Sequence, residues 1–304
     1  MITVRVPAKV NVQLGVGGLR ADGFHDLANV FFAVALGDEV TARHGEGVTL
    51  TCSGPDAGSV PLDDTNLAAR AARLLAAHHG IEPNVALHIA KAIPVAGGMA
   101  GGSADGAAAL VACDALWGLD TPAGVLHELA AELGSDVPFA LLGGVALGRG
   151  RGELLEPLPV TGTFHWVFAV ADGGLSTPAV YGECDRLRAE TGGHTDVEVP
   201  TPDADPALLA ALAAGDPVAL AKALTNDLQP AAVSLRPALA DTLLAGTEAG
   251  ALAALVSGSG PTTAFLVADA ERAAAVAAAL LASGTCRAAH ATYGPVPGAA
   301  VLAG

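Results

Sequence analysis

The feature that most constrains this chain is a glycine-rich segment between an expected strand and an expected helix. It runs from Pro94 to Gly106 and reads PVAGGMAGGSADG. Glycines let the backbone adopt positive φ and approach a ligand closely, and the free N–H groups in the first turn of a helix favour an anion. Ser103 adds a hydroxyl near the expected helix start. The segment therefore predicts a loop that holds phosphate groups through its backbone.

The spacing excludes two better-known phosphate loops. No Gly-Lys-Ser/Thr follows the glycines, as a Walker A loop requires, and no G-x-G-x-x-G lies in a clean βαβ unit, as a dinucleotide site requires. A flexible turn is the alternative, because the chain holds 38 glycines and loose glycine motifs often match by chance.

Two charged residues outside this segment are candidates for chemistry. Lys9 stands in an apolar strand pattern and is one of only three lysines among 15 basic residues; a lysine supplies a compact ammonium rather than a planar guanidinium. Asp136 stands at an expected helix start, where a carboxylate more often caps the helix than acts as a general base. A lysine on an edge strand can also simply reach solvent. Taken alone, neither residue decides the function.

Two further loops carry residues that suit a ligand. Gly258 to Pro261 reads GSGP after an expected strand, which indicates either a loop that closes over phosphates or an ordinary turn. Phe24 and His25 follow Gly23 in an expected turn, and an aromatic ring beside an imidazole in a loop suits a flat ligand. Local packing is the other interpretation of these rings.

Charge and composition limit the kinds of molecule that this protein is expected to bind. The 31 acidic and 15 basic residues give a net charge of −16, so long-range repulsion opposes nucleic acids and anionic membranes. The N-terminus has no apolar core of signal-peptide length, and no apolar stretch reaches the roughly 18 residues that span a bilayer. The cysteines form no C-x-x-C pair, which argues against a zinc or redox motif. We expect a cytoplasmic protein with small-molecule ligands.

Hydrophobic patterning predicts a mixture of strands and helices without the regular alternation of a doubly wound sheet. Strands are expected over 2–14, 28–36, 84–90, 143–152, 164–171, 252–256 and 263–267, with a strand pair over 39–51 about a turn at 45–47. Helices are expected over 67–79, 107–117, 122–133, 206–214, 217–224, 237–249 and 270–281, with another beginning near 135–138. The polar stretch 191–206 is expected to be a long exposed loop.

Read in order, three motifs resemble the GHMP kinases (galactose, homoserine, mevalonate and phosphomevalonate kinases). They are Pro7 to Asn11, Pro94 to Ala108 and Val256 to Thr262. Three more resemble the members of this superfamily that act on 4-CDP-2-C-methyl-D-erythritol: RADGFH at 20–25, GSDVPF at 134–139 and NDLQP at 226–230.

The resemblance implies a two-domain α+β fold with the active site in the interdomain cleft. It implies an ATP-binding domain over 1–158 and a C-terminal GHMP kinase domain over 159–304. It implies phosphorylation of the 2-hydroxyl of 4-CDP-2-C-methyl-D-erythritol in non-mevalonate isoprenoid synthesis, with ATP as co-substrate and Mg²⁺ as cofactor. We expect no nucleic-acid partner and either a monomer or a weak homodimer.

Residue roles follow from the same resemblance. Lys9 and Asp136 match the catalytic pair, with Asp136 as the base and Lys9 stabilising the alkoxide. The positions that match ATP-binding residues are Pro94, Val95, Ala96, Gly97, Gly98, Met99, Ala100, Gly101, Gly102, Ser103, Ala104, Asn66 and Lys91. The positions that match substrate-binding residues are Asn11, Phe24, His25 and Tyr181. No residue matches a metal ligand.

Three departures from the usual loop of the family bear on its conformation and chemistry. Ala96 and Ala100 replace glycines, which restricts φ at both positions, and Ala104 replaces a hydroxyl residue. Two other functions stay open on the sequence. One is a GHMP kinase with homoserine or a phosphomevalonate as acceptor, and the other is a non-catalytic anion-binding module on the same fold.

Overall fold

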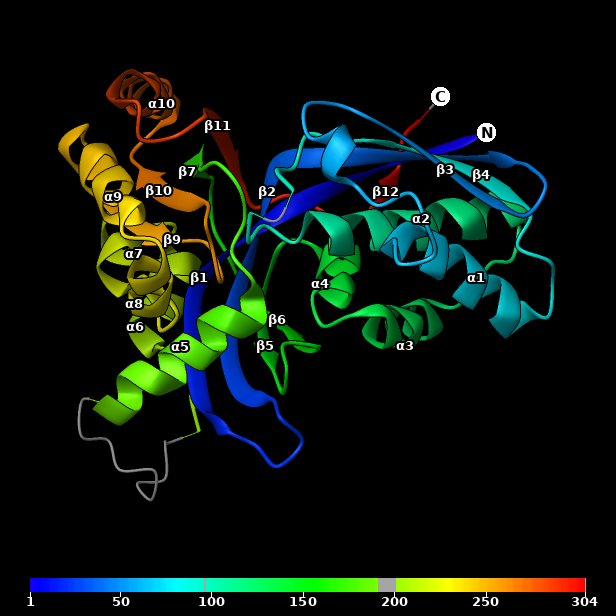
Figure 1. Ribbon diagram of the computed structural model, residues 1–304, viewed down its shortest axis with the longest axis horizontal. Coiled ribbons are helices and arrows are strands. Elements are labelled where there is room, and N and C mark those ends of the chain that lie inside the picture. Colours follow the sequence, from blue (N-terminus) through cyan, green and yellow to red (C-terminus); the bar gives the residue numbers. More distant parts are fainter. Residues whose placement is uncertain (96, 191–200, 304) are drawn as a thin grey trace.

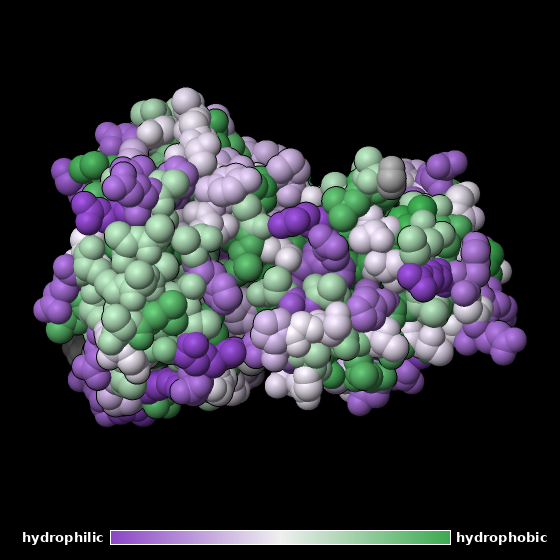
Figure 2. Space-filling view, turned by 90° about the horizontal axis from the view of Figure 1, so that it is seen from above, coloured by the Kyte–Doolittle hydropathy of each residue, from purple (hydrophilic) through white to green (hydrophobic). Residues whose placement is uncertain are grey.

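The computed structural model describes residues 1–95, 97–190 and 201–303. Two lobes share two long strands: α1 to α4 lie on one side of β1 and β2, and α5 to α10 lie on the other (Figure 1). Seen from above, the surface narrows between the lobes, and hydrophilic residues lie at this waist (Figure 2). The sequence resemblance predicted a mixed fold of this kind.

The larger sheet is built around β1 (Ile2–Leu19) and β2 (His25–His44), which pair antiparallel along most of their length. Its strand order is β12-β1-β2-β4-β3, with β3 over Val48–Ser53, β4 over Val85–Ala90 and β12 over Ala300–Val301. β5 (Val145–Arg149) pairs with β2 and with β6 (Leu154–Pro157), and β8 (Thr225–Asn226) pairs parallel with β1.

Helix α2 (Gly101–Trp117) is the central helix of this lobe and contacts β1, β2 and α1 (Leu67–His79). Ten of its 17 residues are buried, and a helix that is apolar on all sides is expected inside a protein. Its small side chains let the sheet and α1 approach closely from opposite sides. Around it lie a 3₁₀ turn at Ala57–Ser59, α3 (Ala123–Leu133) and α4 (Val137–Leu142).

The smaller sheet is antiparallel in the order β11-β7-β10-β9. Its strands are β7 (Phe164–Val170), β9 (Ala253–Val256), β10 (Thr263–Val267) and β11 (Ala288–Gly294). The helices of this lobe are α5 (Thr177–Glu190), α6 (Pro206–Ala214), α7 (Pro217–Ala223), α8 (Gln229–Leu235), α9 (Ala238–Glu248) and α10 (Ala270–Ser283).

Several sequence expectations are confirmed closely, including the helix over 67–79. Asn66 caps that helix, and Gly80 ends it with a φ of 65°. The strand pair expected over 39–51 is wrong, because β4 lies between its two halves: both β2 and β3 pair with β4. The helix expected over 107–117 begins at Gly101 instead. The patterning also missed α5, α8, β6, β11 and β12.

Two short strands from the later part of the chain return to the larger sheet and pair with β1. β12 pairs with β1 of the larger sheet although it follows the whole smaller lobe, and β8 joins β1 at Gln13 and Leu14. The boundary expected near residue 158 stays a prediction. Of the loop expected over 191–206, residues 191–200 lie outside the described part of the chain. Within the described residues, no helix is both long and apolar enough to cross a membrane.

Candidate active site

A cleft of about 800 Å³ lies between the lobes. Its walls come from β1, β2, the glycine segment, α5 and the loop after β9. Cavities of this size suit a small-molecule ligand. Because β1 and β2 run through both lobes, they fix the two walls relative to one another.

Lys9 lies on β1 at the centre of this cleft. Its register with β2 shifts on both sides, between Pro7 and Ala8 and between Asn11 and Gln13; such bulges re-aim side chains near active sites. Lys9 Nζ donates to Asn11 Oδ1 at 2.7 Å and to the Gly98 carbonyl at 3.0 Å. Burial lowers the pKa of Lys9, although the Asp136 carboxylate partly offsets it.

Asp136 faces Lys9 instead of capping its own helix. It occupies the N-cap position of α4, but its side chain makes no capping hydrogen bond. Asp136 Oδ2 lies 3.7 Å from Lys9 Nζ, and the two side chains are 32% and 8% exposed. The helix-cap interpretation, the more common one for such a residue, is therefore wrong here. The carboxylate stays accessible to a ligand in the cleft.

Two glycine loops interlock beside this pair. Gly98, at a φ of 75°, has no room for a side chain, because a Cβ there would lie 2.1 Å from the Ser257 carbonyl oxygen. Thr262 N–H donates to the Gly97 carbonyl, and the Ser257 hydroxyl donates to the Gly98 carbonyl. The segment and the loop after β9 therefore form one unit around the ammonium of Lys9.

Helix α2 begins directly at this unit. Ala100 precedes the helix in a left-handed conformation, with φ 58° and ψ 32°. The backbone therefore has the conformation that a glycine would favour, although the residue is an alanine. Gly101, Gly102 and Ser103 form the first turn and line the cleft. The first N–H groups of a helix have no intrahelical partner and favour anions. This geometry suits a phosphate group.

Asn226 holds the second glycine loop in place. Its amide Nδ2 donates to the carbonyls of Val256 and Gly258 at 2.7 and 2.8 Å. Gln229 Oε1 accepts from the backbone N–H of Val256 at 2.9 Å. Both residues belong to the NDLQP motif, so the motif fixes the loop that lies over Lys9.

Rings gather along another wall of the cleft. His25 begins β2, and its ring lies 5.1 Å from that of Tyr181 on α5, centroid to centroid. Burial raises the pKa of Tyr181, and the nearby Asp136 carboxylate raises it further. Phe24 is 48% exposed, and the guanidinium of Arg151 lies 5.1 Å from its ring centroid. These rings offer flat apolar surfaces to a ligand.

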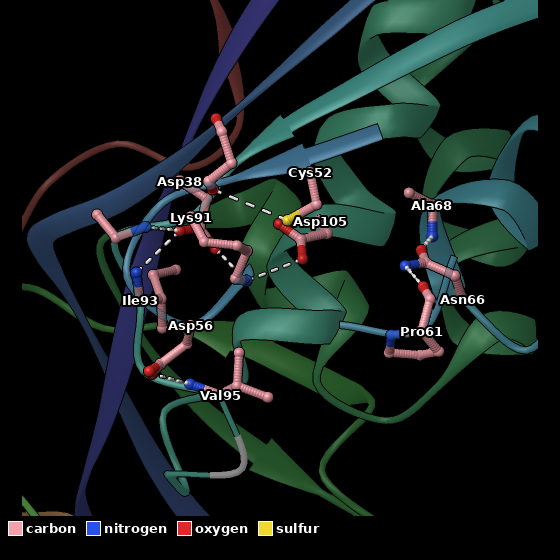
Figure 3. Close-up of polar contacts among 12 residues, drawn as sticks. Asp38, Cys52, Asp56, Pro61, Asn66, Ala68, Lys91, Ile93, Val95 and Asp105 are labelled. Carbon is pink, nitrogen blue, oxygen red and sulfur yellow. Dashed lines mark hydrogen bonds and ion pairs between the residues drawn. The ribbon is translucent and has the colours of Figure 1, made fainter. Parts of the chain in front are cut away.

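Lys91 is enclosed between Asp38 and Asp105 (Figure 3). Its Nζ donates to Asp38 Oδ2 at 2.5 Å and to Asp105 Oδ2 at 2.8 Å. Burial lowers the pKa of Lys91, but the two carboxylates outweigh it, and the pKa lies above its ordinary value. Burial, aided by Asp38 and opposed by Lys91, raises the pKa of Asp105 to about 7. Asp38 Oδ1 also accepts from the backbone N–H groups of Ala92 and Ile93.

Asn66 has a structural role as well. Its Oδ1 accepts from Ala68 N–H at 2.8 Å and its Nδ2 donates to the Pro61 carbonyl at 2.7 Å (Figure 3).

The entry of the glycine segment is held by Asp56: Val95 N–H donates to Asp56 Oδ2 at 3.3 Å. Asp56 also pairs with Arg287 of the smaller lobe, so this contact ties the entry of the glycine segment to both lobes.

The structure brings most of the expected site residues to one cleft. Those that line it are Lys9, Asn11, Phe24, His25, Gly97, Gly98, Ala100, Gly101, Gly102, Ser103, Asp136 and Tyr181. Those that do not line it are Asn66, Lys91, Pro94, Val95, Met99 and Ala104, and Ala96 lies outside the described residues. Every individual binding role stays a prediction.

Sequence reasoning missed Arg151, a charged residue that lines this cleft. A second charged residue of the cleft, Asp185, was also missed. It lies on α5, four residues after Tyr181, and contacts His25. A four-residue spacing places two side chains on the same face of a helix. The four-residue spacing of Tyr181 and Asp185 is visible in the sequence. It could not be interpreted, because helix α5 was not predicted.

Comparison with known proteins decides the family. The model of the GHMP kinases N-terminal domain matches residues 66–144, and that of the GHMP kinases C-terminal domain matches residues 208–285. The chain belongs to the GHMP kinase family. The resemblance drawn from its motifs is confirmed, and the family assignment makes the protein an ATP-using kinase.

This GHMP kinase has close relatives over its full length. It is 69% identical over 301 residues to the 4-diphosphocytidyl-2-C-methyl-D-erythritol kinase of Streptomyces avermitilis, covering 99% of both chains. It is 57% identical over 301 residues to the enzyme of that name from Mycolicibacterium smegmatis, covering 99% of this chain and 92% of the relative.

Solved structures agree with the family assignment. A crystal structure of 4-(cytidine 5′-diphospho)-2C-methyl-D-erythritol kinase matches with a TM-score of 0.76 and 33% identity, over 96% of this chain and 99% of the other. A homoserine kinase from Cytophaga hutchinsonii matches with a TM-score of 0.73 over 99% and 97% of the two chains. At 24% identity, the second match shows the shared fold alone.

Proposed function

We propose that this GHMP kinase transfers the γ-phosphoryl group of ATP to the 2-hydroxyl of 4-CDP-2-C-methyl-D-erythritol. The products are the 2-phosphate and ADP, and the step belongs to non-mevalonate isoprenoid precursor synthesis. The observation that carries the proposal is the approach of Lys9 and Asp136 to 3.7 Å beside a loop shaped for phosphate. The full-length identity to kinases of that name supports the choice of acceptor.

Asp136 is placed to accept the proton of the attacking alcohol. The pKa of an alcohol lies far above neutrality, so the proton must leave as the oxygen attacks phosphorus, and a positioned carboxylate can take it. The side chain reaches the cleft because it does not cap α4. The bond that forms joins the hydroxyl oxygen to the γ-phosphorus, and the bond that breaks joins that phosphorus to the β–γ bridging oxygen.

Lys9 supports the same step through its charge. Its ammonium lies 3.7 Å from the Asp136 carboxylate, beside the place where the attacking hydroxyl would give up its proton. It also stabilises the negative charge that develops on the attacking oxygen. The hydrogen bonds to Asn11 and Gly98 hold the ammonium in place. Positioning and charge supply most of the rate in phosphoryl transfer.

The residues of the cleft fit the way Mg²⁺ is bound with nucleotides. Mg²⁺ is usually held by one or two carboxylates, water and substrate phosphates rather than by an all-protein cage. The described residues contain no cluster of three or more His, Cys, Asp or Glu side chains, but Ser103 and Asp136 both line the cleft. We infer that Ser103 would supply a protein oxygen, while the Asp136 carboxylate stays free to accept the proton. When bound, Mg²⁺ would neutralise charge on the triphosphate.

An assay with the purified full chain tests this proposal. ATP, Mg²⁺ and 4-CDP-2-C-methyl-D-erythritol are expected to give ADP and the 2-phosphate in equal amounts. Homoserine and phosphomevalonate serve as competing acceptors and are expected to give no ADP above background. Preferred turnover of either one would replace the proposed acceptor. ATP binding without ADP formation from any acceptor would favour a non-catalytic binding module.

A further inference from the structure

A row of three buried polar side chains lies on the face of β1 and β2 that borders the cleft. Lys9 and Asn11 stand two residues apart on β1, and Asn29 stands on β2. Asn11 pairs with Phe31 across the two strands, and Asn29 precedes Phe31 by two residues, so these side chains leave the sheet on one face. Asn29 is therefore the diagonal neighbour of Asn11, within reach of its amide.

Two hydrogen bonds join this row. Lys9 Nζ donates to Asn11 Oδ1 at 2.7 Å, and Asn11 Nδ2 donates to Asn29 Oδ1 at 2.7 Å. The three residues are only 7%, 2% and 4% exposed. An ammonium can only donate, so it fixes which end of the Asn11 amide faces it. The nitrogen of this amide is then turned towards Asn29, whose oxygen accepts.

We propose that Asn29 is a positioning residue for catalysis, because it holds Asn11 Oδ1 against the ammonium of Lys9. This inference deepens the proposed function and rests on it, since it concerns the same catalytic pair. A buried N–H group without an acceptor costs free energy. Without the Asn29 oxygen, the Asn11 amide would turn to find another acceptor, and Lys9 would lose a contact that fixes its ammonium beside Asp136. Asn29 belongs to none of the sequence motifs.

The surroundings of Lys9 offer few substitutes for this contact. Its ammonium lies 3.0 Å from the Gly98 carbonyl, 3.7 Å from the Asp136 carboxylate and 5.9 Å from the centroid of the Phe31 ring. Of these three groups, only Asp136 carries a charge. Burial already lowers the pKa of Lys9, and a hydrogen bond to a charged form favours that form. The contact with Asn11 therefore helps to keep the ammonium protonated.

Two substitutions of Asn29 separate positioning from packing. Asn29→Leu keeps the approximate size and removes the acceptor, whereas Asn29→Asp keeps an acceptor oxygen and adds a negative charge. The kcat of Asn29→Leu should fall at least about tenfold, and that of Asn29→Asp should fall less. Asn29→Ala removes the same acceptor with a smaller side chain and replaces Asn29→Leu should the latter not fold.

The pH dependence of the two variants is the decisive measurement. The alkaline limb of kcat/KM reports a group of the free enzyme, here the ammonium of Lys9. It should move to lower pH in Asn29→Leu, which loses the oriented acceptor, and to higher pH in Asn29→Asp, which brings a negative charge closer. Limbs that move the same way in both variants, or that do not move, would overturn the inference.

Thr242→Val is the matched control. Thr242 is also a buried polar residue, 3% exposed, and its hydroxyl donates to the Thr285 carbonyl at 3.0 Å in the smaller lobe. It does not line the cleft. Its substitution is expected to lower the free energy of unfolding without moving the alkaline limb. A limb that moves equally in this control and in Asn29→Leu would attribute the shift to a loosened fold and overturn the positioning role.

Acetylation of Lys9 gives a second readout that needs no phosphoryl transfer. The full chain is treated with a trace of acetic anhydride at several pH values, and mass spectrometry follows Lys9, with the exposed Lys222 as internal reference. Only the free amine reacts, so the midpoint of the labelling curve reports the proton on Lys9.

The labelling midpoint should move to lower pH in Asn29→Leu and to higher pH in Asn29→Asp. An unchanged midpoint in Asn29→Leu would overturn the inference. Opposite shifts in a protein that phosphorylates no cytidyl acceptor would instead contradict the proposed function, and they would leave the hold of Asn29 on Lys9 standing.

Discussion

Lys9 Nζ lies 3.7 Å from Asp136 Oδ2 although the two residues come from a strand at the start of the chain and from the beginning of α4. The carboxylate takes this position instead of bonding to the free N–H groups of its own helix. A carboxylate at a helix start usually gains stability by capping. The position of the Asp136 carboxylate beside a buried ammonium is therefore better explained by a role in proton transfer than by stabilisation of α4.

Replacing Asp136 is expected to separate catalysis from stability. Asp136→Ala should lower kcat by about 10²-fold or more, because the alcohol loses its base. Its cost in stability is limited to the pairing with Lys9, whose ammonium keeps its hydrogen bonds to Asn11 and Gly98. Asp269→Ala is the contrasting control: Asp269 does cap α10, through the N–H of Arg272. It should lose about 1 kcal/mol of stability and keep its activity. Steady-state kinetics and urea unfolding of both variants check this, and near-normal turnover of Asp136→Ala would exclude the base role.

The buried ammonium of Lys9 predicts an early loss of activity at high pH. Burial lowers the pKa of Lys9 below its ordinary value of 10.5, so its proton leaves at a lower pH than that of a free lysine. The alkaline limb of kcat/KM, which reports groups of the free enzyme, should therefore fall below pH 10.5. In Lys9→Arg the guanidinium stays charged, and its residual activity should lack this limb. A wild-type limb at or above pH 10.5 would contradict the assignment.

Asp105 predicts a pH-dependent contribution to stability. Burial raises its pKa from 3.8 to about 7, so between these values the folded protein binds more protons than the unfolded chain. The contribution of Asp105 to the free energy of unfolding is therefore largest at low pH and is lost as the pH rises through about 7. In Asp105→Asn this loss is absent.

The measurement for Asp105 is urea unfolding of both proteins between pH 5 and pH 8. The difference in unfolding free energy should shift in favour of Asp105→Asn as the pH rises. A difference that stays constant over this range would show that the carboxyl group does not hold a proton in the folded state.

Phe24 predicts a selective effect on the cytidyl substrate. Its ring is half exposed at the cleft, and stacking of a base on an aromatic side chain contributes about 1–3 kcal/mol. Phe24→Ala should therefore raise KM for 4-CDP-2-C-methyl-D-erythritol about tenfold and leave KM for ATP nearly unchanged. Phe24→Tyr keeps the ring and serves as the control. Equal changes in both KM values would place the turn outside the acceptor site.

Ala100 predicts a gain in stability on substitution by glycine. Its φ of 58° lies in the left-handed region, which costs a residue with a Cβ roughly 1–2 kcal/mol. Ala100→Gly should therefore raise the free energy of unfolding by about 1 kcal/mol. Gly80 has a similar φ of 65° with open space around it, so Gly80→Ala should cost about 1 kcal/mol. Urea unfolding of both variants tests the pair, and changes of equal sign would refute it.

The elements that sequence patterning predicted well are those whose ends carry local signals. The helix over 67–79 has a capping asparagine before it and a glycine after it, and both act within one turn of the chain. The elements it missed lack such signals or depend on distant partners. β12, for example, has only two residues and exists because β1 offers it an edge.

The sequence by itself determined the family and predicted an anion-binding glycine segment, because glycines and a helix start act over a few neighbouring residues. Only the tertiary structure decided which charged residues meet. In the folded protein, Asp136 contacts Lys9 and does not cap its own helix. Lys91 lies between two carboxylates, and Asp185 contacts His25. Such contacts depend on how strands and helices far apart in the chain are arranged in space, and residue spacing along the chain does not contain that arrangement.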